Sequence, residues 1–243
     1  MLIQKSDIIS RLQKDILPLQ GFKTIGNNTV TDVGLGAINN AFPNASFPVG
    51  AVHEFISVGA ENAAATSGFV AGVLGALMRS GGAAIWISDS KTIFPPALQS
   101  FGIAPDKIIF IDLHKEKEML WAMEEALKCE GLAAVIAEIP DITFMVSRRL
   151  QLAVEQSQVT GFILRRDPRN VNTTACVTRW KISPLPSELT DEMPGVGFPR
   201  WNVELLKVRN GKPGNWQIEF VAGRFRQIST IAAIRPDQQK KTG

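Results

Sequence analysis

The sequence predicts an α/β fold in which a mostly parallel sheet, covered by helices, continues into antiparallel strands near the C-terminus. Short apolar segments alternate with helical segments between residues 49 and 167, as in parallel sheets that are buried on both faces. After residue 170, strand-like segments follow one another directly. The chain has 243 residues, 45% hydrophobic and 20% charged, which suffices for one substantial core.

The first part of the chain is expected to alternate regularly between strands and helices. A first helix is expected over 6–17, where apolar residues recur at helical spacing after Ser6, a suitable N-cap. The expected strands are 49–57, 81–88, 106–113, 132–139 and 160–167. Further helices are expected over 67–79, 116–131 and 147–159, with a turn and a short helix over 92–103.

The C-terminal part is expected to add antiparallel strands over 172–182, 199–211 and 215–228. Asn210-Gly211 predicts a hairpin between the last two strands. We therefore divide the chain into an N-terminal amphipathic helix and linker (1–45), a core domain (46–226) and a polar C-terminal tail (227–243).

Composition argues against several classes of function. The net charge of +3 permits contact with nucleic acid but does not argue for it. The chain contains only Cys129, Cys176, His53 and His114 as cysteines and histidines, so we expect no disulfide framework, no metal site and no cofactor. The N-terminus does not resemble a signal peptide, and the apolar run "GFVAGVLGALM" is too short to cross a membrane. A cytoplasmic protein is expected.

Residues 59–66, "GAENAAAT", occupy the position of a phosphate-binding loop, between an expected strand and an expected helix. In the pattern G-x-x-x-x-G-K-[ST], Gly59 and Thr66 match the first and last positions. Ala64 replaces the second glycine, so a methyl group obstructs the approach of phosphate, and Ala65 replaces the charged lysine. Amides at the helix N-terminus could still hold an anion. The segment is either a degenerate nucleotide loop, with no ATPase expected, or an ordinary alanine-rich turn.

The surrounding sequence resembles the RecA recombinase family. The segment "FPVGAVHEFISVGAENAAAT" matches the entry to its nucleotide site, and the match continues through "GGAAIWISDSKTIFPPALQSFGIAPDKII". The resemblance implies a RecA-like three-layer fold. It also places Glu138 at the position of the Walker B aspartate and Ser90 at the position of the glutamate that activates water. With the lysine, the glycine and this glutamate all replaced, we expect no catalytic residue.

Several motifs in the second half resemble the ImuA family, a group of RecA-related accessory proteins of bacterial inducible mutagenesis. They are "LWAMEEALKCEGLAAVIAEI", "SRRLQLAVEQSQVTGFILRR", "VTRWKISPLPS" and "PRWNVELLKVRNGKPGNW", and the resemblance runs from about residue 45 to 225. It implies a non-catalytic adaptor in translesion synthesis after DNA damage. The implied partners are ImuB, an error-prone replicative-type polymerase and RecA, and the implied location is the cytoplasm, with nucleoid association after damage.

A basic cluster follows the fifth expected strand, where RecA has its second DNA-binding loop. Arg165, Arg166 and Arg169 form this cluster, and Arg179 lies just beyond it. Arginine side chains can bind phosphate through two hydrogen bonds, so these residues are candidate DNA or partner contacts. The alternative is an ordinary solvated loop. The segment lacks the glycine-rich character of the RecA loop, and we therefore expect only weak DNA binding.

Other candidates concern protein partners. Arg148 and Arg149 could meet a carboxylate of a partner or of Glu138, or form structural salt bridges. Trp180, Trp201 and Trp216 are expected to pack in the C-terminal strands, and an exposed tryptophan there, with Trp201 and Trp216 as candidates, would mark a partner surface. Helix 6–17 either supports self-association or packs on its own domain. The tail from residue 227 either engages ImuB or is unstructured.

Two other functions are compatible with the sequence. One is an inhibitor of cell division of the SulA type, which also has a RecA-like fold without a working loop. The other is an active RecA-like ATPase or recombinase with an atypical loop, which would have to bind nucleotide without a lysine at position 65.

Overall fold

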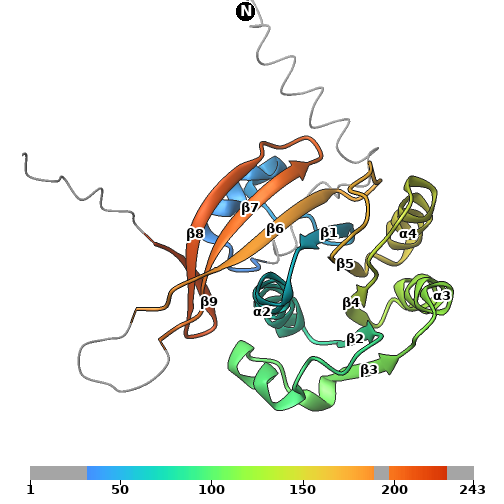
Figure 1. The fold of residues 1–243 in the computed structure, drawn as a ribbon, viewed down its shortest axis with the longest axis horizontal. Coiled ribbons are helices and arrows are strands. Elements are labelled where there is room, and N and C mark those ends of the chain that lie inside the picture. Colours follow the sequence, from blue (N-terminus) through green and yellow to red (C-terminus); the bar gives the residue numbers. More distant parts are fainter. Residues whose placement is uncertain (1–31, 189–196, 229–243) are drawn as a thin grey trace, which may run out of the picture.

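The structure, a computed structural model, describes residues 32–188 and 197–228 and contains one nine-stranded sheet in the order β3-β2-β4-β5-β1-β6-β7-β8-β9 (Figure 1). The strands are β1 (Val52–Ser57), β2 (Ala83–Ser88), β3 (Ile108–Asp112), β4 (Leu132–Glu138), β5 (Thr160–Arg166), β6 (Thr178–Leu185), β7 (Arg200–Val208), β8 (Gly214–Val221) and β9 (Arg224–Gln227). Strands β1 to β6 pair in parallel with one another. Strands β7, β8 and β9 follow β6 in the sheet, and each pairs antiparallel with the strand before it.

Helices cover both faces of this sheet. The α-helices are α2 (Ala60–Leu77), α3 (Glu116–Leu127) and α4 (Phe144–Ser157). The 3-10 helices are η1 (Gly36–Ala41), η2 (Pro43–Ala45), η3 (Met78–Ser80), η4 (Pro95–Phe101) and η5 (Pro105–Lys107). Figure 1 shows α2 nearly end-on, with the curved sheet wrapped around it, while α3 and α4 lie on the outer face. The predicted three-layer α/β arrangement is confirmed.

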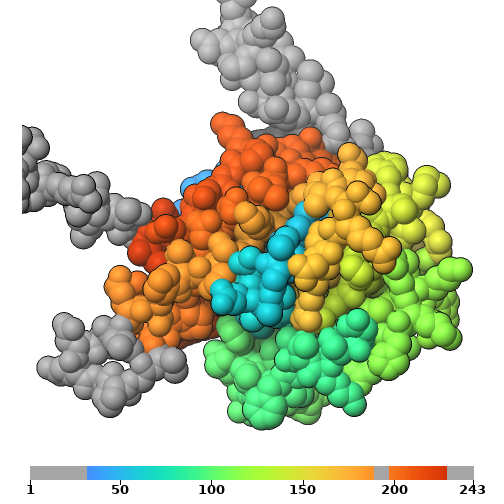
Figure 2. Space-filling view, viewed as in Figure 1, coloured from blue at the N-terminus to red at the C-terminus, as the bar shows by residue number. Residues whose placement is uncertain are grey.

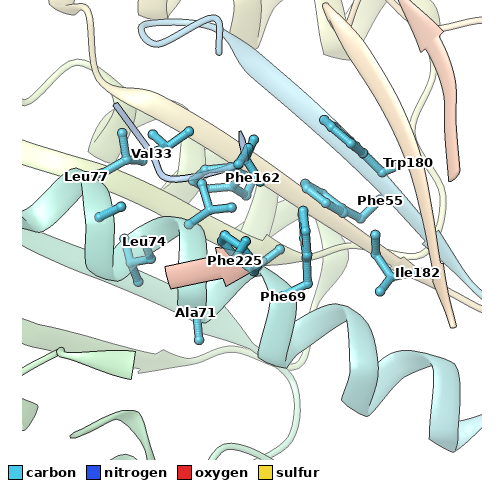
Figure 3. Close-up of a cluster of buried hydrophobic side chains, with 14 of the residues drawn as sticks. Val33, Phe55, Phe69, Ala71, Leu74, Leu77, Phe162, Trp180, Ile182 and Phe225 are labelled. Carbon is cyan, nitrogen blue, oxygen red and sulfur yellow. The ribbon is translucent and has the colours of Figure 1, made fainter. Parts of the chain in front are cut away.

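The inner core forms where the C-terminal strands fold over α2. Phe55 of β1, Phe69 of α2, Trp180 of β6 and Phe225 of β9 pack together there (Figure 3), and the Phe55 and Trp180 rings stack at 5.9 Å. Glycines in α2 permit this close approach, since a Cβ on Gly72 would lie 2.6 Å from the Phe225 ring. The antiparallel extension is therefore part of the main core, not an appendage.

Most predicted elements are present, with three corrections. The strand expected over 172–182 is β6 and begins at Thr178, because the carbonyls of Asn172, Thr174 and Ala175 accept hydrogen bonds from cationic side chains instead of from a neighbouring strand. The expected strand 215–228 is a hairpin of β8 and β9, because Ala222 and Gly223 have φ of 49° and 74° and form a tight turn. Helix α2 begins at Ala60, not at residue 67. Its first turns are rich in alanine and carry an acid, Glu61, and both features favour helix at this end.

The core also includes residues that the sequence analysis assigned to the linker. Val33, Leu35, Ile38 and Phe42 are buried in the inner core, and η1 packs against β8 and β9. Apolar residues in an irregular segment have no periodicity, so their burial could not be predicted. The expected helix 6–17 lies outside the described residues, as does the tail from residue 229 onward.

Helix α2 with η3 is also long and apolar enough to cross a membrane by length and composition, which the apolar run considered in the sequence analysis was not. This segment, Ala60–Ser80, is the one such candidate in the described part of the chain, and 67% of its most apolar window is buried. Its apolar character matches its place at the centre of the inner core.

Candidate functional site

The start of α2 has the geometry of a capped helix and not that of a phosphate cradle. Gly59 has φ of 79° and ψ of 162°, and α-helix follows at once. The Ala63 amide donates to the Gly59 carbonyl over 3.1 Å, so the following amides are used in helical hydrogen bonds. Ala64 is exposed and Ala65 is buried within the helix. The Thr66 hydroxyl donates to the Asn62 carbonyl over 2.7 Å.

The Asp167 carboxylate lies against the turn at Gly59 that precedes α2. Asp167, which follows β5, has φ of 45° and accepts a hydrogen bond from the Gly59 amide over 2.9 Å. An external anion at this helix N-terminus would therefore compete with the Asp167 carboxylate for the Gly59 amide. The positive end of the helix dipole faces Asp167 and Glu61, and both would repel a phosphate.

Glu138 lies at the predicted Walker B position, at the end of β4, where its Oε1 accepts a hydrogen bond and its Oε2 is buried without one in the described part of the chain. The Trp86 indole donates to its Oε1 over 2.9 Å, and Arg166 Nη2 lies 3.1 Å from its Oε2. Burial raises the pKa of Glu138, while the Trp86 hydrogen bond and Arg166 lower it. In the described part of the chain, no group of three His, Cys, Asp or Glu residues could hold a metal ion.

Ser90 follows β2 and supplies a turn instead of a catalytic acid. Its carbonyl accepts hydrogen bonds from the Ser88 hydroxyl and the Thr92 amide, both over 2.9 Å. Thr92 in turn accepts a hydrogen bond from Arg166 over 3.0 Å. The segment therefore links the ends of β2 and β5.

Two of the four predicted contact arginines are turned into the fold, Arg165 completely buried and Arg179 partly buried, which corrects the sequence analysis. Arg165 and Glu54 are completely buried, and their side chains meet at 2.6 Å. Arg179 Nε lies 2.8 Å from the other oxygen of Glu54, and its side chain is only 14% exposed. The Thr174 hydroxyl also donates to Glu54, over 2.8 Å. These arginines neutralise a buried carboxylate, so they cannot serve as DNA contacts in this conformation.

Arg165 and Arg179, together with two cations of β7 and the turn after it, bind the loop after β5, residues 167–177, to the sheet. Its carbonyls accept hydrogen bonds from successive cations: Arg165 to Asn170, Arg179 to Asn172, Lys207 to Thr174 and Arg209 to Ala175. Burial lowers the pKa of Lys207 and of Arg209. Four cationic side chains therefore bond this loop to the sheet through charge-assisted hydrogen bonds.

Arg166 and Arg169 keep some exposure. The Arg166 side chain is 28% exposed and is directed toward Glu138 and Thr92. The Arg169 side chain is 84% exposed and lies 3.3 Å from Asp141. Of the predicted cluster, Arg169 is thus the arginine best placed to meet a partner or DNA.

Arg148 and Arg149 make salt bridges on the outer face. Arg149 contacts Glu124 of α3, and Arg148 Nη1 lies 3.6 Å from Glu155. Glu138 is not among these partners. Both arginines remain exposed, so the structural role and a partner role are both compatible with their positions.

The tryptophans divide between core and surface. Trp180 is completely buried and Trp201 is 4% exposed, so the prediction of Trp201 as an exposed partner contact is wrong. Its ring packs against Phe69, Phe220 and Phe225. Trp216 is partly buried at the edge of the inner core and remains a candidate.

A cleft of about 570 Å³ opens beside the start of α2. Its α2 wall is made of small residues: Ala60, Ala63, Ala64, Ser67, Gly68 and Ala71. The facing wall is the segment 92–101, with Ile93, Phe94, Leu98 and Phe101. In Figure 2 the cyan start of α2 reaches the surface between this green segment and the yellow loop after β5. The lining is mostly apolar, with Arg166 and Asp167 at its border, and it suits apolar side chains better than a triphosphate.

The sequence analysis missed the role of Glu54 and the positions of its partners. Glu54 is 111 and 125 residues from Arg165 and Arg179 in sequence, and only the order of strands brings them together. One signal was present, because an acid inside the strand "VHEFIS", which was expected to be buried on both faces, requires a cationic partner. Asp167 gave no comparable signal.

Sequence comparison with known proteins assigns the chain to a family. Protein ImuA from two strains of Caulobacter vibrioides is 36% identical over 229 residues, which cover 85% of this chain and 93% of that protein. The chain belongs to the ImuA family. The cell division inhibitor SulA of Photorhabdus laumondii is 28% identical to this ImuA-family chain over 95 residues, or 39% of the chain and 54% of SulA. No protein-family model matches the chain.

Solved structures confirm the fold of this ImuA-family chain. The RadB recombinase superposes with a TM-score of 0.56 and 14% sequence identity, covering 82% of this chain and all of RadB (100%). At this identity the likeness concerns the fold alone. The prediction of a RecA-like α/β fold with C-terminal antiparallel strands is confirmed.

Proposed function

We propose that this chain is a non-catalytic adaptor of an inducible mutagenesis complex that acts in translesion synthesis after DNA damage. Membership of the ImuA family supports this role. The proposed partners are ImuB and an error-prone replicative-type polymerase, with RecA as a further contact. The proposed location is the cytoplasm, with association to the nucleoid after damage. The ATPase chemistry of the RecA fold is proposed to be lost.

The single observation that carries the loss of chemistry is the start of α2. Because helix begins at Ala60, the amides from Ala63 onward are bonded within the helix, and the Gly59 amide binds Asp167. No lysine stands at position 65, and removal of one preorganised donor typically costs about 2.7–4 kcal/mol in a transition state. At the Walker B position, Glu138 Oε2 lies 3.1 Å from Arg166 Nη2 and makes no hydrogen bond within the described residues, so a cation of the chain itself already faces this carboxylate.

The fastened loop after β5 supports an adaptor rather than a filament-forming DNA binder. Arg165 and Arg179 are engaged with Glu54 and with loop carbonyls. Exposed Arg169 could add a phosphate contact, which is consistent with weak DNA binding only.

The proposal is tested by pairwise binding of the purified chain to ImuB, to the polymerase, to RecA and to single-stranded DNA, each at two salt concentrations. We expect salt-tolerant binding to at least one protein and weak DNA binding that falls steeply with salt. A calorimetric titration with ATP and Mg²⁺ should show no binding. Micromolar ATP binding, with turnover that is lost in Glu138→Gln, would instead establish an active ATPase.

A SulA-type inhibitor of cell division is the second candidate, and the partial similarity to SulA of Photorhabdus laumondii favours it. That match covers 39% of this chain, against 85% for Protein ImuA. Affinity purification of the tagged chain from DNA-damaged cells separates the two. Recovery of the division protein FtsZ, without ImuB or RecA, would favour the inhibitor and contradict the adaptor.

A further inference from the structure

The cleft beside α2 has a wall that carries almost no side-chain bulk. The α2 residues that line it form one helical stripe, and none is larger than serine. Such a stripe lets the backbone or the large side chains of another chain approach closely. The opposite wall contributes Phe94, whose side chain projects to solvent with 68% of its surface exposed.

A buried hydroxyl in the cleft lacks a hydrogen-bond partner within the described residues. Ser67 is 7% exposed, lines the cleft, and its Oγ makes no hydrogen bond there. Buried hydroxyls are normally paired, so this group points to a ligand that brings a donor or an acceptor. A polypeptide backbone supplies both, whereas a hydrocarbon chain supplies neither.

The charges at the mouth of the cleft select the type of ligand. Glu61 and Asp167 are both exposed at the start of α2, and Asp167 borders the cleft. Arg166 also lines the cleft, but it is paired with Glu138 at 3.1 Å. Arg200 lines a second hollow beside α2 and is paired with Glu188 and Glu219. Negative charge at this end disfavours phosphates and anionic lipid headgroups and favours a ligand that carries a lysine or an arginine.

The cleft is also longer than one side chain requires. It shares Ala64, Gly68 and Phe101 with a second hollow of about 690 Å³ on the other side of α2, which Trp201 and Pro199 help to line. The two hollows meet across the exposed ridge at Ala64. A polypeptide segment that crosses this ridge would have apolar surface on both sides.

We propose that this cleft is a docking site for a segment of a partner protein. The segment inserts large apolar side chains between α2 and residues 92–101, and it places a lysine or an arginine beside Glu61 and Asp167. This inference rests on the proposed adaptor function and names the surface through which the adaptor binds.

The test compares the full chain with Ala64→Glu, Glu61→Lys and Phe94→Ser. Ala64 is exposed in the ridge, so a glutamate there fills and charges the cleft while α2 can still form. The matched control is Ala104→Glu, the same chemical change at an exposed position that does not line the cleft. Unchanged thermal unfolding curves establish that each variant is folded.

Affinities for ImuB, the polymerase and RecA are measured by biolayer interferometry. We expect Ala64→Glu to weaken one of these complexes about tenfold or more, and Ala104→Glu to change it less than about twofold. Phe94→Ser and Glu61→Lys should weaken the same complex. Overlapping 20-residue peptides of that partner should identify a binding segment with large apolar residues and a lysine or an arginine.

The outcomes separate the two proposals. If the wild-type chain binds none of the three proteins, the adaptor function fails. If it binds but Ala64→Glu leaves every affinity unchanged, or if the binding peptide is acidic, only the docking site is refuted. If Ala64→Glu alters self-association in sedimentation velocity and no partner complex, the occupant is a second copy and the proposal is wrong.

Discussion

The start of α2 and the loop after β5 lie side by side, and they differ in opposite ways from the nucleotide and DNA sites that the resemblance to RecA predicts at these positions. At the start of α2 the lysine and the second glycine of the phosphate-loop pattern are absent, and Ala64 and Ala65, which stand in their places, lie within a regular helix. In the loop after β5 the charged residues are present but face inward, since Arg165 and Arg179 bind the buried Glu54. Asp167 joins the two regions through the Gly59 amide.

The difference separates two cases: a residue of a motif can be absent from the sequence, or it can be present and bound to another partner. A deleted lysine can be recognised in the sequence, because the residue is simply missing. An arginine that has turned toward a buried acid cannot, because its residue type and position in the chain are unchanged. Two questions follow: whether the start of α2 fails to bind phosphate even when the glycine and the lysine are supplied, and whether ion pairs hold the loop after β5 in place.

The largest effect is expected from Glu54→Gln. The substitution leaves Arg165 buried without a carboxylate, and removal of one partner of a buried pair typically costs about 3–5 kcal/mol. Urea denaturation followed by circular dichroism measures the change, and limited proteolysis should show new cleavage in the loop after β5.

The control for this prediction is Glu118→Gln, which breaks the exposed pair with Lys115 and should leave stability nearly unchanged. If Glu54→Gln is as stable as this control, charge does not hold the loop in place, and the contrast between the two regions disappears.

The next effect concerns acid stability and His53, the neighbour of Glu54 on β1. Burial lowers the pKa of His53 from 6.5 to about 3, and its ring lies between Phe47 and Phe162 while bonding Pro48 and Thr178. Between these pKa values the unfolded chain binds a proton that the folded chain excludes. The free energy of unfolding should therefore fall by about 1.4 kcal/mol per pH unit below pH 6.5, or about 3 kcal/mol by pH 4.

Other groups titrate in this range, and Glu138, whose pKa is raised, acts in the opposite direction. The slope due to His53 is therefore measured as the difference between the wild-type chain and His53→Gln at each pH from 7 to 4. The variant starts less stable, but it should lose stability less steeply on acidification. Parallel curves for the two proteins would show that His53 is protonated in the folded state.

The fold could be predicted from sequence more completely than the site. Continuous apolar strands and amphipathic helices report directly on burial, so β1 to β6 and the outer helices were found. Two features were hidden by local ambiguity: the alanines of 60–66 favour helix as readily as loop, and Ala222-Gly223 is a weak turn signal. The network around Glu54 depends on the order of the strands, which a single sequence does not contain.

A smaller effect is expected from Gly75→Ala in α2. A Cβ at this position would lie 2.1 Å from the Phe101 carbonyl oxygen, so the 92–101 segment has to move. Overpacking of this kind typically costs about 1–3 kcal/mol, which thermal unfolding will detect. Gly131→Ala is the control, because nothing lies within 4 Å of its added Cβ. Equal stability of the two variants would mean that the wall facing α2 is easily displaced.

The smallest effect is expected where a nucleotide loop is rebuilt. The double variant Ala64→Gly with Ala65→Lys supplies the glycine and the lysine of the motif. Ala65 is buried in the inner core, so a thermal unfolding curve first establishes that the variant is folded. In the folded variant we expect the helix to begin at Ala60 and Asp167 to bind the Gly59 amide, as in the wild-type chain. ATP with Mg²⁺ should therefore bind more weakly than about 1 mM in calorimetry, as for the wild-type chain. Adding Asp167→Asn removes the competing carboxylate and should raise affinity only slightly. Micromolar binding by the double variant would show that side chains alone had been lost, and that the backbone at the start of α2 can still open around a phosphate.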